Sequence, residues 1–331
     1  MNLIYLCHAN NRPIGGIKVI YKLAELSDAL LGPDGEACVL HPNRPGFRCT
    51  WFDAKVKLRR AWFGLQWVGK PSFSKITRHF DPANDVVVIP ELWVRKYGVQ
   101  LARLGVPYAI FVQNGYLIAN GKREDLALAY QHAKLILSVS EDTSDCVAMA
   151  FPQARDKIHR IHLFVDPVKF KPAAQKEKLI TYMPRKLAQH SSLFKFFLQD
   201  KLPPGWRLQA IDGLDEAGVA ELLGRSQIFV SFSYMEGLGL PPIEAALAGN
   251  HVIGYTGEAG KEFWDPAIFT EVFQGDITGL AQGVLSLVAR GDTVDRQAHD
   301  AARRKLAQTF SAQAQQRDVQ DFLQQIDVLA G

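Results

Sequence analysis

Two carboxylates, Glu236 and Glu244, enclose a short loop that contains two glycines, Gly237 and Gly239. Glycine has no Cβ atom, so the backbone of such a loop can approach a ligand closely. Free amides at the start of a following helix, together with the positive end of its dipole, suit a phosphate. A carboxylate does not suit phosphate, but Glu244 can accept hydrogen bonds from ribose hydroxyls. The pattern therefore predicts a site for phosphate and ribose.

The elements that position this loop follow from its flanks. An apolar run at residues 228–232 predicts a buried strand, and residues 242–249 predict a helix with proline in its first turn and glycine at its end. Glu236 then lies at the end of a strand, where open α/β sheets place their ligands. Pro242 stands where a dinucleotide-binding fingerprint has its third glycine, so that motif is absent. Taken alone, a glycine loop with two solvated glutamates is the plainer alternative.

Residues 236–245, Glu-Gly-Leu-Gly-Leu-Pro-Pro-Ile-Glu-Ala, resemble the donor-site signature of glycosyltransferase family 4, Glu-Gly-Phe-Gly-Leu-Pro-x-x-Glu-Ala. Only Leu238 departs from it, in place of the usual Phe. The resemblance implies the GT-B architecture, an α/β fold of two Rossmann-like domains whose parallel sheets face an interdomain cleft. It also implies that a nucleotide-diphosphate sugar binds mainly to the second domain and the acceptor mainly to the first.

The first part of the chain carries two segments that resemble family motifs. Gly15 and Gly16 follow a predicted strand and open a helix; by themselves they fit a tight packing turn equally well. The resemblance implies that they lie beside the donor diphosphate and the acceptor. Gln113 and Asn114 stand where many members carry a histidine close to the reacting sugar. We expect one of these two side chains to hydrogen-bond the sugar or acceptor instead, with a plain Asn-Gly turn as the alternative.

Two further segments follow in the family's order. Residues 161–170 resemble the interdomain segment Ile-Pro-Asn-Gly-Val-Asp-x-x-x-Phe, although His-Leu-Phe replaces Pro-Asn-Gly. Arg185 matches the arginine that neutralises the donor diphosphate in the family. The usual lysine position falls near His190, so the adjacent Lys186 is the alternative cation there. Cations facing a diphosphate stabilise the charge that grows on the leaving group.

The alternation of strands and helices indicates parallel sheets with helices on both faces. It is interrupted at residues 171–178, which are polar, charged and without an apolar period, and which predict a linker. We therefore predict an N-terminal acceptor-side Rossmann-like domain at residues 1–170 and a C-terminal nucleotide-sugar-binding domain at residues 179–309. The resemblance implies that residues 310–331 form a helix that crosses back to the first domain. A length of 331 residues fits two domains.

The composition narrows the classes of function. Hydrophobic residues make up 47% and charged residues 22%, as in globular proteins, and no apolar run approaches the roughly 20 residues of a membrane span. The N-terminus lacks a signal peptide's basic region, and the four cysteines form no C-x-x-C pair, which predicts a cytoplasmic protein without disulfides or zinc. Neither Asp-x-Asp, metal-ligand histidine spacing, a nucleophile elbow nor a Walker A loop occurs, so we expect no cofactor and no metal.

Residues 43–82 combine basic and aromatic side chains. This composition suits an anionic membrane surface or an anionic lipid-linked acceptor, and a solvated basic face with inward aromatics is the alternative. Stacking on single-stranded nucleic acid is conceivable, but no nucleic-acid-binding motif accompanies it, so we expect no nucleic-acid partner. The residues are Arg44, Arg48, Trp51, Phe52, Lys55, Lys57, Arg59, Arg60, Trp62, Phe63, Trp67, Lys70, Lys75 and Arg78.

The resemblance implies a retaining, metal-independent glycosyltransferase that acts on a glycan or lipid-linked glycan, in the cytoplasm or peripherally on the inner face of the membrane. Glu236 would hold hydroxyls of the donor sugar and stabilise the positive charge developing on it, and Arg185 would stabilise the departing diphosphate. A diphosphate oxygen would take the acceptor's proton, so a dedicated base is unnecessary. The implied donor-binding residues are Gly15, Gly16, Lys186, His190, Gly237, Leu238, Gly239, Leu240 and Glu244.

A non-catalytic subunit is the competing interpretation. The missing histidine and the altered lysine position would also fit a chain that keeps the fold and binds a sugar nucleotide or a partner. An epimerase or a phosphorylase on the same fold is a third interpretation, although a phosphorylase usually needs a much longer chain and a lysine for pyridoxal phosphate. The nucleotide base, the sugar, the acceptor and the oligomeric state do not follow from the sequence.

Overall fold

The computed structural model describes residues 1–330 except 43, 45, 61–79 and 291–295. Its contacts divide the chain into two compact units, Met1–Ile161 with Gln315–Gly331 and His162–Ala314. The sequence analysis places the end of the first domain at residue 170, whereas the contacts place the boundary between the units after Ile161. None of the helices in the described parts of the chain is long and apolar enough to cross a membrane.

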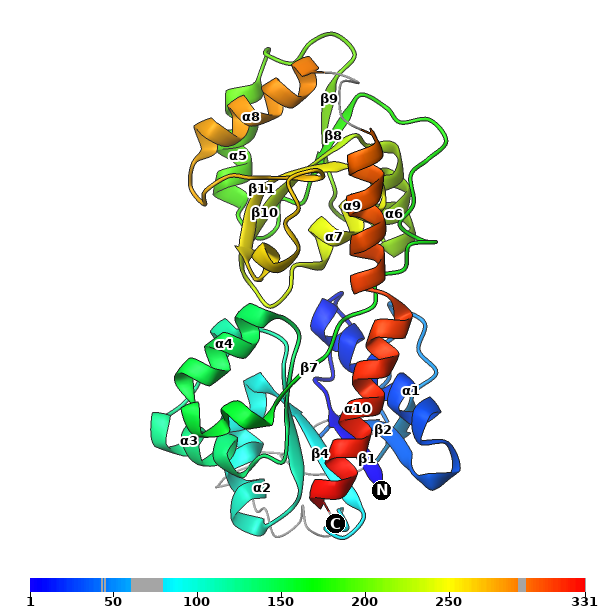
Figure 1. Ribbon diagram of the computed structural model, residues 1–331, viewed down its shortest axis with the longest axis vertical. Helices are drawn as coiled ribbons and strands as arrows, with labels where there is room; N and C mark the ends of the chain where they lie inside the picture. The colour runs from blue at the N-terminus through cyan, green and yellow to red at the C-terminus, as the bar shows by residue number, and fades with distance from the viewer. Residues whose placement is uncertain (43, 45, 61–79, 291–295, 331) are drawn as a thin grey trace. The chain divides into compact units, whose positions relative to one another are not determined.

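The first unit is built on a parallel sheet with the strand order β3-β2-β1-β4-β5-β6-β7 (Figure 1). Its order reverses between β1 and β4, which makes this pair the switch point, where open α/β sheets bind ligands beyond the carboxyl ends of the strands. β4 is buried along its whole length, as expected for a strand covered on both faces. The strands are β1 (Asn2–Leu6), β2 (Glu36–Leu40), β3 (Lys57–Arg59), β4 (Asp85–Pro90), β5 (Tyr108–Val112), β6 (Ile136–Ser138) and β7 (Ile158–Arg160).

The helical segment that follows β4 is not one continuous helix. A 3-10 turn, a π-helix and a short α-helix follow one another there. The segments are α1 (Gly15–Leu31), η1 (Gly32–Asp34), η3 (Glu91–Trp93), the π-helix η4 (Val94–Gly98), α2 (Val99–Leu104), η5 (Gly115–Leu117), α3 (Arg123–His132), α4 (Glu141–Ala150), η6 (Pro152–Lys157) and α10 (Ala312–Ala330). From Gln315 onward α10 belongs to this unit, where His159 Nε2 hydrogen-bonds Asp318 O at 2.8 Å.

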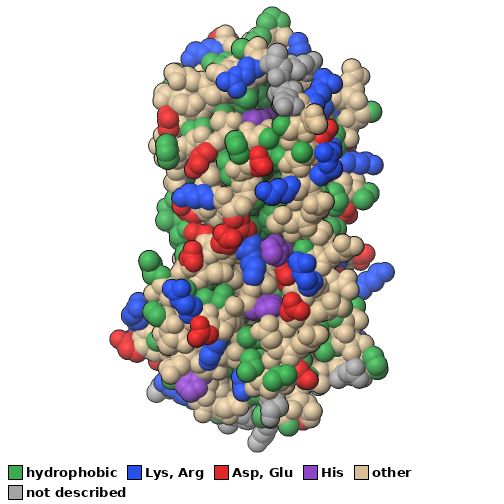
Figure 2. All heavy atoms as spheres, in the orientation of Figure 1, with side chains coloured by type: hydrophobic (Ala, Val, Ile, Leu, Met, Phe, Trp, Pro, Cys, Tyr) green, Lys and Arg blue, Asp and Glu red, His purple; other side chains and the backbone are tan. Residues whose placement is uncertain are grey.

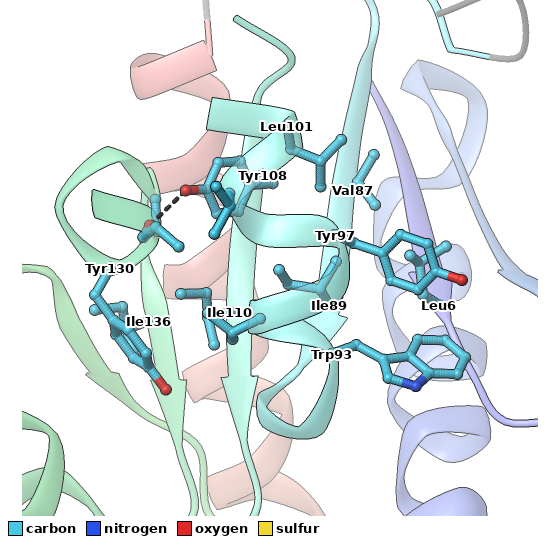
Figure 3. Packing of buried hydrophobic residues seen from close by; sticks show 14 of the residues in the cluster. Leu6, Val87, Ile89, Trp93, Tyr97, Leu101, Tyr108, Ile110, Tyr130 and Ile136 are labelled. Atoms are coloured by element: carbon cyan, nitrogen blue, oxygen red, sulfur yellow. Dashed lines mark hydrogen bonds between the residues drawn. The ribbon is translucent and has the colours of Figure 1, made fainter. Parts of the chain in front are cut away.

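The core of the first unit lies between its sheet and the helices that follow β4 and β5. Trp93 and Tyr97 point from η3 and η4 toward Leu6 of β1 (Figure 3). On the same side, the hydroxyl of Tyr108 donates to the carbonyl of Ala129 in α3 (Figure 3). Large aromatic side chains therefore tie the segments after β4 to the centre of the sheet.

The second unit has a smaller parallel sheet in the order β12-β11-β10-β8-β9. Its switch point lies between β8 and β10. The strands are β8 (Leu179–Tyr182), β9 (Arg207–Ala210), β10 (Ile228–Glu236), β11 (His251–Glu258) and β12 (Phe269–Glu271). The helices are α5 (Ala188–Leu198), α6 (Glu216–Arg225), α7 (Leu240–Leu247), η7 (Ala259–Phe263), α8 (Ile277–Arg290) and α9 (Arg296–Thr309). The sequence gives no clear signal for α9, because only Ala302 and Leu306 are buried along it and its apolar stripe is therefore narrow.

Residues 171–178, predicted as a linker, belong to the second unit in the contact division. Lys176 Nζ donates to the carbonyls of Ser226 at 2.6 Å and Ala248 at 2.5 Å, which follow the ends of α6 and α7. A cation is favourable there because helix carboxyl ends carry partial negative charge and unpaired carbonyls. Burial nevertheless lowers the pKa of Lys176 to about 7. The polar composition that indicated a linker thus serves to cap two helices.

The described part of the basic stretch uses its charges within the first unit. Arg48 donates to the carbonyls of Ala54 and Val56 at 2.9 and 3.0 Å. Lys57 pairs with Asp28 at 2.9 Å, and Arg59 pairs with buried Asp85 at 3.0 Å. On the face shown in Figure 2, basic and acidic side chains are interspersed. The remaining members of the stretch (Trp62, Phe63, Trp67, Lys70, Lys75 and Arg78) lie outside the described residues.

A buried hydrogen-bond chain joins four segments of the first unit. His41 Nδ1 lies 2.9 Å from the carbonyl of Cys7, which can only accept, so this nitrogen carries the proton. Nε2 of the neutral ring then accepts from the hydroxyl of Tyr21 at 2.6 Å, and that hydroxyl accepts from the amide of Cys49 at 3.3 Å. Burial lowers the pKa of His41 to about 4, in agreement with a neutral ring.

We expect His41 to lower the free energy of unfolding as the pH drops from about 6.5 to about 4. The unfolded chain protonates His41 near pH 6.5, whereas the folded protein does so only near pH 4, so stability present above pH 6.5 is lost across this window. His251, whose pKa burial also lowers to about 4, acts in the same direction. Glu91, whose pKa burial raises to about 7, acts in the opposite direction between about pH 7 and pH 4.5. The loss from His41, roughly 1–3 kcal/mol, is measured as the change in the stability difference between the wild type and a His41 variant, by urea unfolding at a series of pH values.

The contribution of His41 can be isolated by substitution. His41→Asn should be less stable at pH 7.5 and should lose less stability on acidification than the wild type. His132→Asn, at an exposed position on α3, should reproduce the wild-type pH dependence. Parallel pH profiles for His41→Asn and the wild type would contradict the assignment.

Candidate functional site

The predicted site residues of the second unit follow its two switch-point strands, β8 and β10. Arg185 and Lys186 lie in the loop after β8, and Glu236 is the last residue of β10. Because β8 and β10 are parallel neighbours, their carboxyl ends meet at one edge of the sheet. The loop after β8, which carries Arg185 and Lys186, thus lies beside the end of β10, which carries Glu236.

Lys186 Nζ donates to Glu236 Oε1, so the structure brings these two predicted residues together. The Glu236 side chain is 16% exposed and that of Lys186 is 49% exposed. Ion pairs at such an accessible surface contribute little stability, on the order of 0–1 kcal/mol. The pair can therefore open at small cost, which would release the ammonium for an anion and the carboxylate for hydroxyl groups.

His190, the other candidate for the family's lysine position, has a different partner. Its Nδ1 lies 3.2 Å from the hydroxyl of Tyr255 on β11, and the two rings are nearly perpendicular. Arg185 is exposed on the loop after β8. The structure thus distinguishes Lys186, which contacts Glu236, from His190, which contacts a buried tyrosine.

The glycine loop leads into α7, which begins at Leu240, two residues before its predicted start. Gly239 is the N-cap and has a positive φ of 80°, a conformation that favours glycine. Pro241 and Pro242 occupy the first turn and lack N–H groups, so the amides of Gly239 and Leu240 are the main donors at this helix start. Glu244 is half-buried one turn further along.

Gly257, on β11, supports this site. A Cβ atom at residue 257 would lie 2.7 Å from Ser233 Cβ and 3.1 Å from Glu236 Cγ, and φ is 66°. The pairing of β10 with β11 is irregular between Ser233 and Glu236. The absent side chain at 257 therefore leaves room for the irregular end of β10, and so for the carboxylate of Glu236.

In the first unit, the structure brings Gln113 against the diglycine. A Cβ atom on Gly16 would lie 3.1 Å from Gln113 Oε1, so the amide lies beside the start of α1. That start has Ile14 as N-cap, without a side-chain acceptor, and no acidic residue in the first turn. Asn114 Oδ1 accepts from the amide of Tyr116 at 2.9 Å and caps η5. Of the two candidates, Gln113 is thus the one placed beside the diglycine.

Sequence reasoning missed Glu91, which follows the switch-point strand β4. Its carboxylate is buried, and Oε2 accepts from the amide of Gln113 at 3.3 Å. Burial raises the pKa of Glu91 to about 7, and backbone amides oppose the shift. The only available signal was an acidic residue directly after an apolar strand, which is common at helix starts and therefore uninformative.

Among the residues that the structure describes, no three His, Cys, Asp or Glu side chains gather as they would around a metal ion. The expectation of a metal-independent protein stays a prediction.

No protein-family model matches the chain. A curated relative, an alpha-1,6-glucosyltransferase of Actinobacillus pleuropneumoniae serotype 7 (strain AP76), is 30% identical over 135 residues. The match covers 39% of this chain and 41% of the relative, so the chain spans less than half the length of that protein.

Solved structures resemble the chain over nearly its whole length. HepE from Anabaena in complex with UDP and glucose gives a TM-score of 0.72 at 13% identity and covers 98% of this chain and 99% of that chain. Sucrose-phosphate synthase from Thermosynechococcus elongatus gives 0.70 at 13% identity, with 99% of each chain covered. The lipopolysaccharide outer core galactosyltransferase WaaB in its apo form gives 0.67 at 13% identity, again with 99% of each covered. At this identity the likeness shows the fold, which is the GT-B class with two Rossmann-like units, as predicted.

Replacing Gly257 by alanine should disturb the end of β10. The new Cβ would overlap Ser233 Cβ, so we expect the variant to lose about 2–4 kcal/mol of unfolding free energy and to change the environment of Glu236. Gly213→Ala is a matched control, because φ there is 67° and a Cβ would meet nothing within 4 Å. The control should lose only the roughly 1–2 kcal/mol of a left-handed residue. If urea unfolding gave equal losses of unfolding free energy for Gly257→Ala and Gly213→Ala, Gly257 would be required only for its left-handed backbone conformation and not for the space beside Ser233.

Proposed function

We propose that the protein is a retaining, metal-independent glycosyltransferase that transfers a sugar from a nucleotide-diphosphate sugar to a glycan or lipid-linked glycan. The observation that carries the proposal is the Lys186–Glu236 pair at the switch point of the second unit. A cation for the diphosphate and a carboxylate for the sugar lie in contact there. The residues 236–245, which resemble the family 4 signature, supply this carboxylate and the adjoining helix start.

The donor would bind along the loop after β8 and the start of α7. The diphosphate accepts hydrogen bonds from the amides of Gly239 and Leu240 and faces the cations Arg185 and Lys186. Glu244, one turn inside α7, accepts from the ribose hydroxyls. HepE, with the same fold, has been solved with UDP and with UDP-glucose, which supports a nucleotide-sugar donor here.

Donor binding would exchange the partners of the ion pair. Lys186 leaves Glu236 for the diphosphate, where its charge stabilises the leaving group in the transition state. The freed carboxylate of Glu236 accepts from sugar hydroxyls and stabilises positive charge at the anomeric carbon. As the bond from the anomeric carbon to the diphosphate oxygen breaks, the acceptor oxygen attacks on the same face. Its proton passes to the departing diphosphate oxygen, so configuration is retained without a separate base.

The first unit would supply the acceptor side of the reaction. Gln113, beside Gly16, offers a carbonyl and an amide to acceptor hydroxyls. A surface polysaccharide or its lipid-linked precursor is the proposed acceptor, with peripheral attachment to an anionic membrane through residues 43–82. The names of two similar proteins, a glucosyltransferase and a lipopolysaccharide galactosyltransferase, support a carbohydrate acceptor.

Thermal unfolding with UDP, GDP, ADP, dTDP and CDP tests the donor site. A ligand that binds only the folded state stabilises it by RT ln(1 + [L]/Kd), about 2.7 kcal/mol at a 100-fold excess over Kd. We expect one nucleotide to raise Tm and Glu244→Ala to abolish the rise. Glu221→Ala on α6, where the side chain is 71% exposed, should keep it. No rise with any nucleotide would refute the donor site.

The ion pair is tested by turnover of the nucleotide sugar that corresponds to the nucleotide identified. Lys186→Met and Glu236→Gln should each lower kcat by about 100-fold or more, since each removes charge stabilisation specific to the transition state. Lys195→Met on α5, at an exposed position, serves as the control and should leave turnover unchanged. Nuclear magnetic resonance of the product reports the anomeric configuration. Nucleotide binding without turnover of any donor, with or without acceptor, would favour the non-catalytic subunit.

A further inference from the structure

The 3-10 turn η3, directly after β4, contacts the loops that follow both neighbouring strands. β4 lies between β1 and β5 in the sheet, so the turn stands at the centre of the first unit's switch point. From this turn, Glu91 contacts the loop after β5 and Trp93 contacts the loop after β1. Both side chains are buried, at 4% and 7% exposure.

Glu91 is bonded to the loop after β5 through two groups. Its Oε2 accepts the amide N–H of Gln113 at 3.3 Å, and its main-chain carbonyl accepts from Asn120 Nδ2 at 2.9 Å. The same Asn120 nitrogen donates to Leu117 O at 3.1 Å, at the end of η5. Both ends of the segment from Gln113 to Asn120 are thus attached to one residue of η3.

Trp93 holds the other loop. Its ring and that of His8, the second residue after β1, have centroids 4.1 Å apart. His8 lies near the start of the loop that leads to the diglycine. The turn therefore sets the positions of the two segments that meet where Gln113 Oε1 approaches Gly16.

A buried carboxyl group at this place requires an explanation. Removing a carboxyl group from water costs free energy unless hydrogen bonds replace those to water, and an apolar side chain of similar size would avoid that cost. Burial has raised the pKa of Glu91 to about 7, which reflects this unfavourable environment. A π-helix follows η3, and such segments are frequent at functional sites.

We propose that Glu91 is a positioning residue for the acceptor. Its side chain holds the backbone N–H of Gln113, so that the side-chain amide of Gln113 stays beside Gly16 and can hydrogen-bond a hydroxyl of a glycan acceptor. The assignment of an acceptor rests on the proposed function, whereas the hold on Gln113 does not. Glu91 itself stays beneath the loop and contacts no substrate.

Hydrogen exchange of the backbone N–H of Gln113, measured in the ligand-free protein, tests the positioning step alone. Glu91→Leu removes the acceptor and should speed exchange of this amide at least 10-fold. Glu91→Gln keeps a carbonyl oxygen and should preserve protection within about twofold. Glu124→Gln, at an exposed position on α3, is the control and should change nothing. Unchanged exchange in Glu91→Leu would overturn the proposal whether or not the protein transfers sugar.

Steady-state kinetics test the link to the acceptor. Glu91→Leu should raise KM for the acceptor about 10-fold and leave KM for the donor unchanged, and Glu91→Gln should restore the acceptor KM. Gln113→Ala should raise the acceptor KM similarly. Adding Glu91→Leu to Gln113→Ala should have no further effect, because both substitutions act through the side-chain amide of Gln113. Equal changes in both KM values, or additive effects, would indicate a merely structural role. If the wild type transfers no sugar, the proposed function fails, and Gln113 exchange still decides the hold.

Discussion

The reversal of strand order within each sheet is the constraint on which the rest of the molecule depends. Parallel strands end at one edge, and helices that leave neighbouring strands toward opposite faces draw their loops apart. β1 and β4 form this arrangement in the first unit, and β8 and β10 form it in the second. Residues far apart in the chain, such as Lys186 and Glu236, meet there because their strands pair.

At the second unit's switch point, backbone conformation and charge depend on each other. Gly239 adopts a left-handed conformation that starts α7, and Gly257 leaves room beside Glu236 for the irregular end of β10. The carboxylate is consequently held partly accessible, next to an ammonium group. An accessible ion pair of this kind is weak in water, which makes it easy for a ligand with its own negative charge and hydroxyls to replace both partners.

Buried polar groups hold the loops in both units. Neutral His41 joins Cys7, directly after β1, to Tyr21 of α1. Glu91 holds the loop after β5, and Lys176 caps two helices. Each group is costly to bury and is stabilised by hydrogen bonds to backbone atoms. Such contacts prescribe one arrangement where apolar packing would tolerate several. Burial shifts the pKa of each group from its ordinary value. It lowers the pKa of His41 to about 4 and that of Lys176 to about 7, and it raises the pKa of Glu91 to about 7.

The sequence by itself determined the fold class and the strand and helix on either side of the glycine loop, because apolar periodicity and glycine or proline punctuation are local properties. The short strands β3 and β7 have no such pattern. The sequence also singled out Glu236, Glu244 and the glycine loop as a candidate site, because their spacing lies within one segment. Only the tertiary structure decided that Lys186 contacts Glu236 while His190 contacts Tyr255, since strand pairing determines which side chains meet. It likewise separated Gln113, beside Gly16, from Asn114, which caps a turn. Glu91, the capping role of Lys176 and the helix α9 required it too, because burial and partners distant in sequence leave no local pattern.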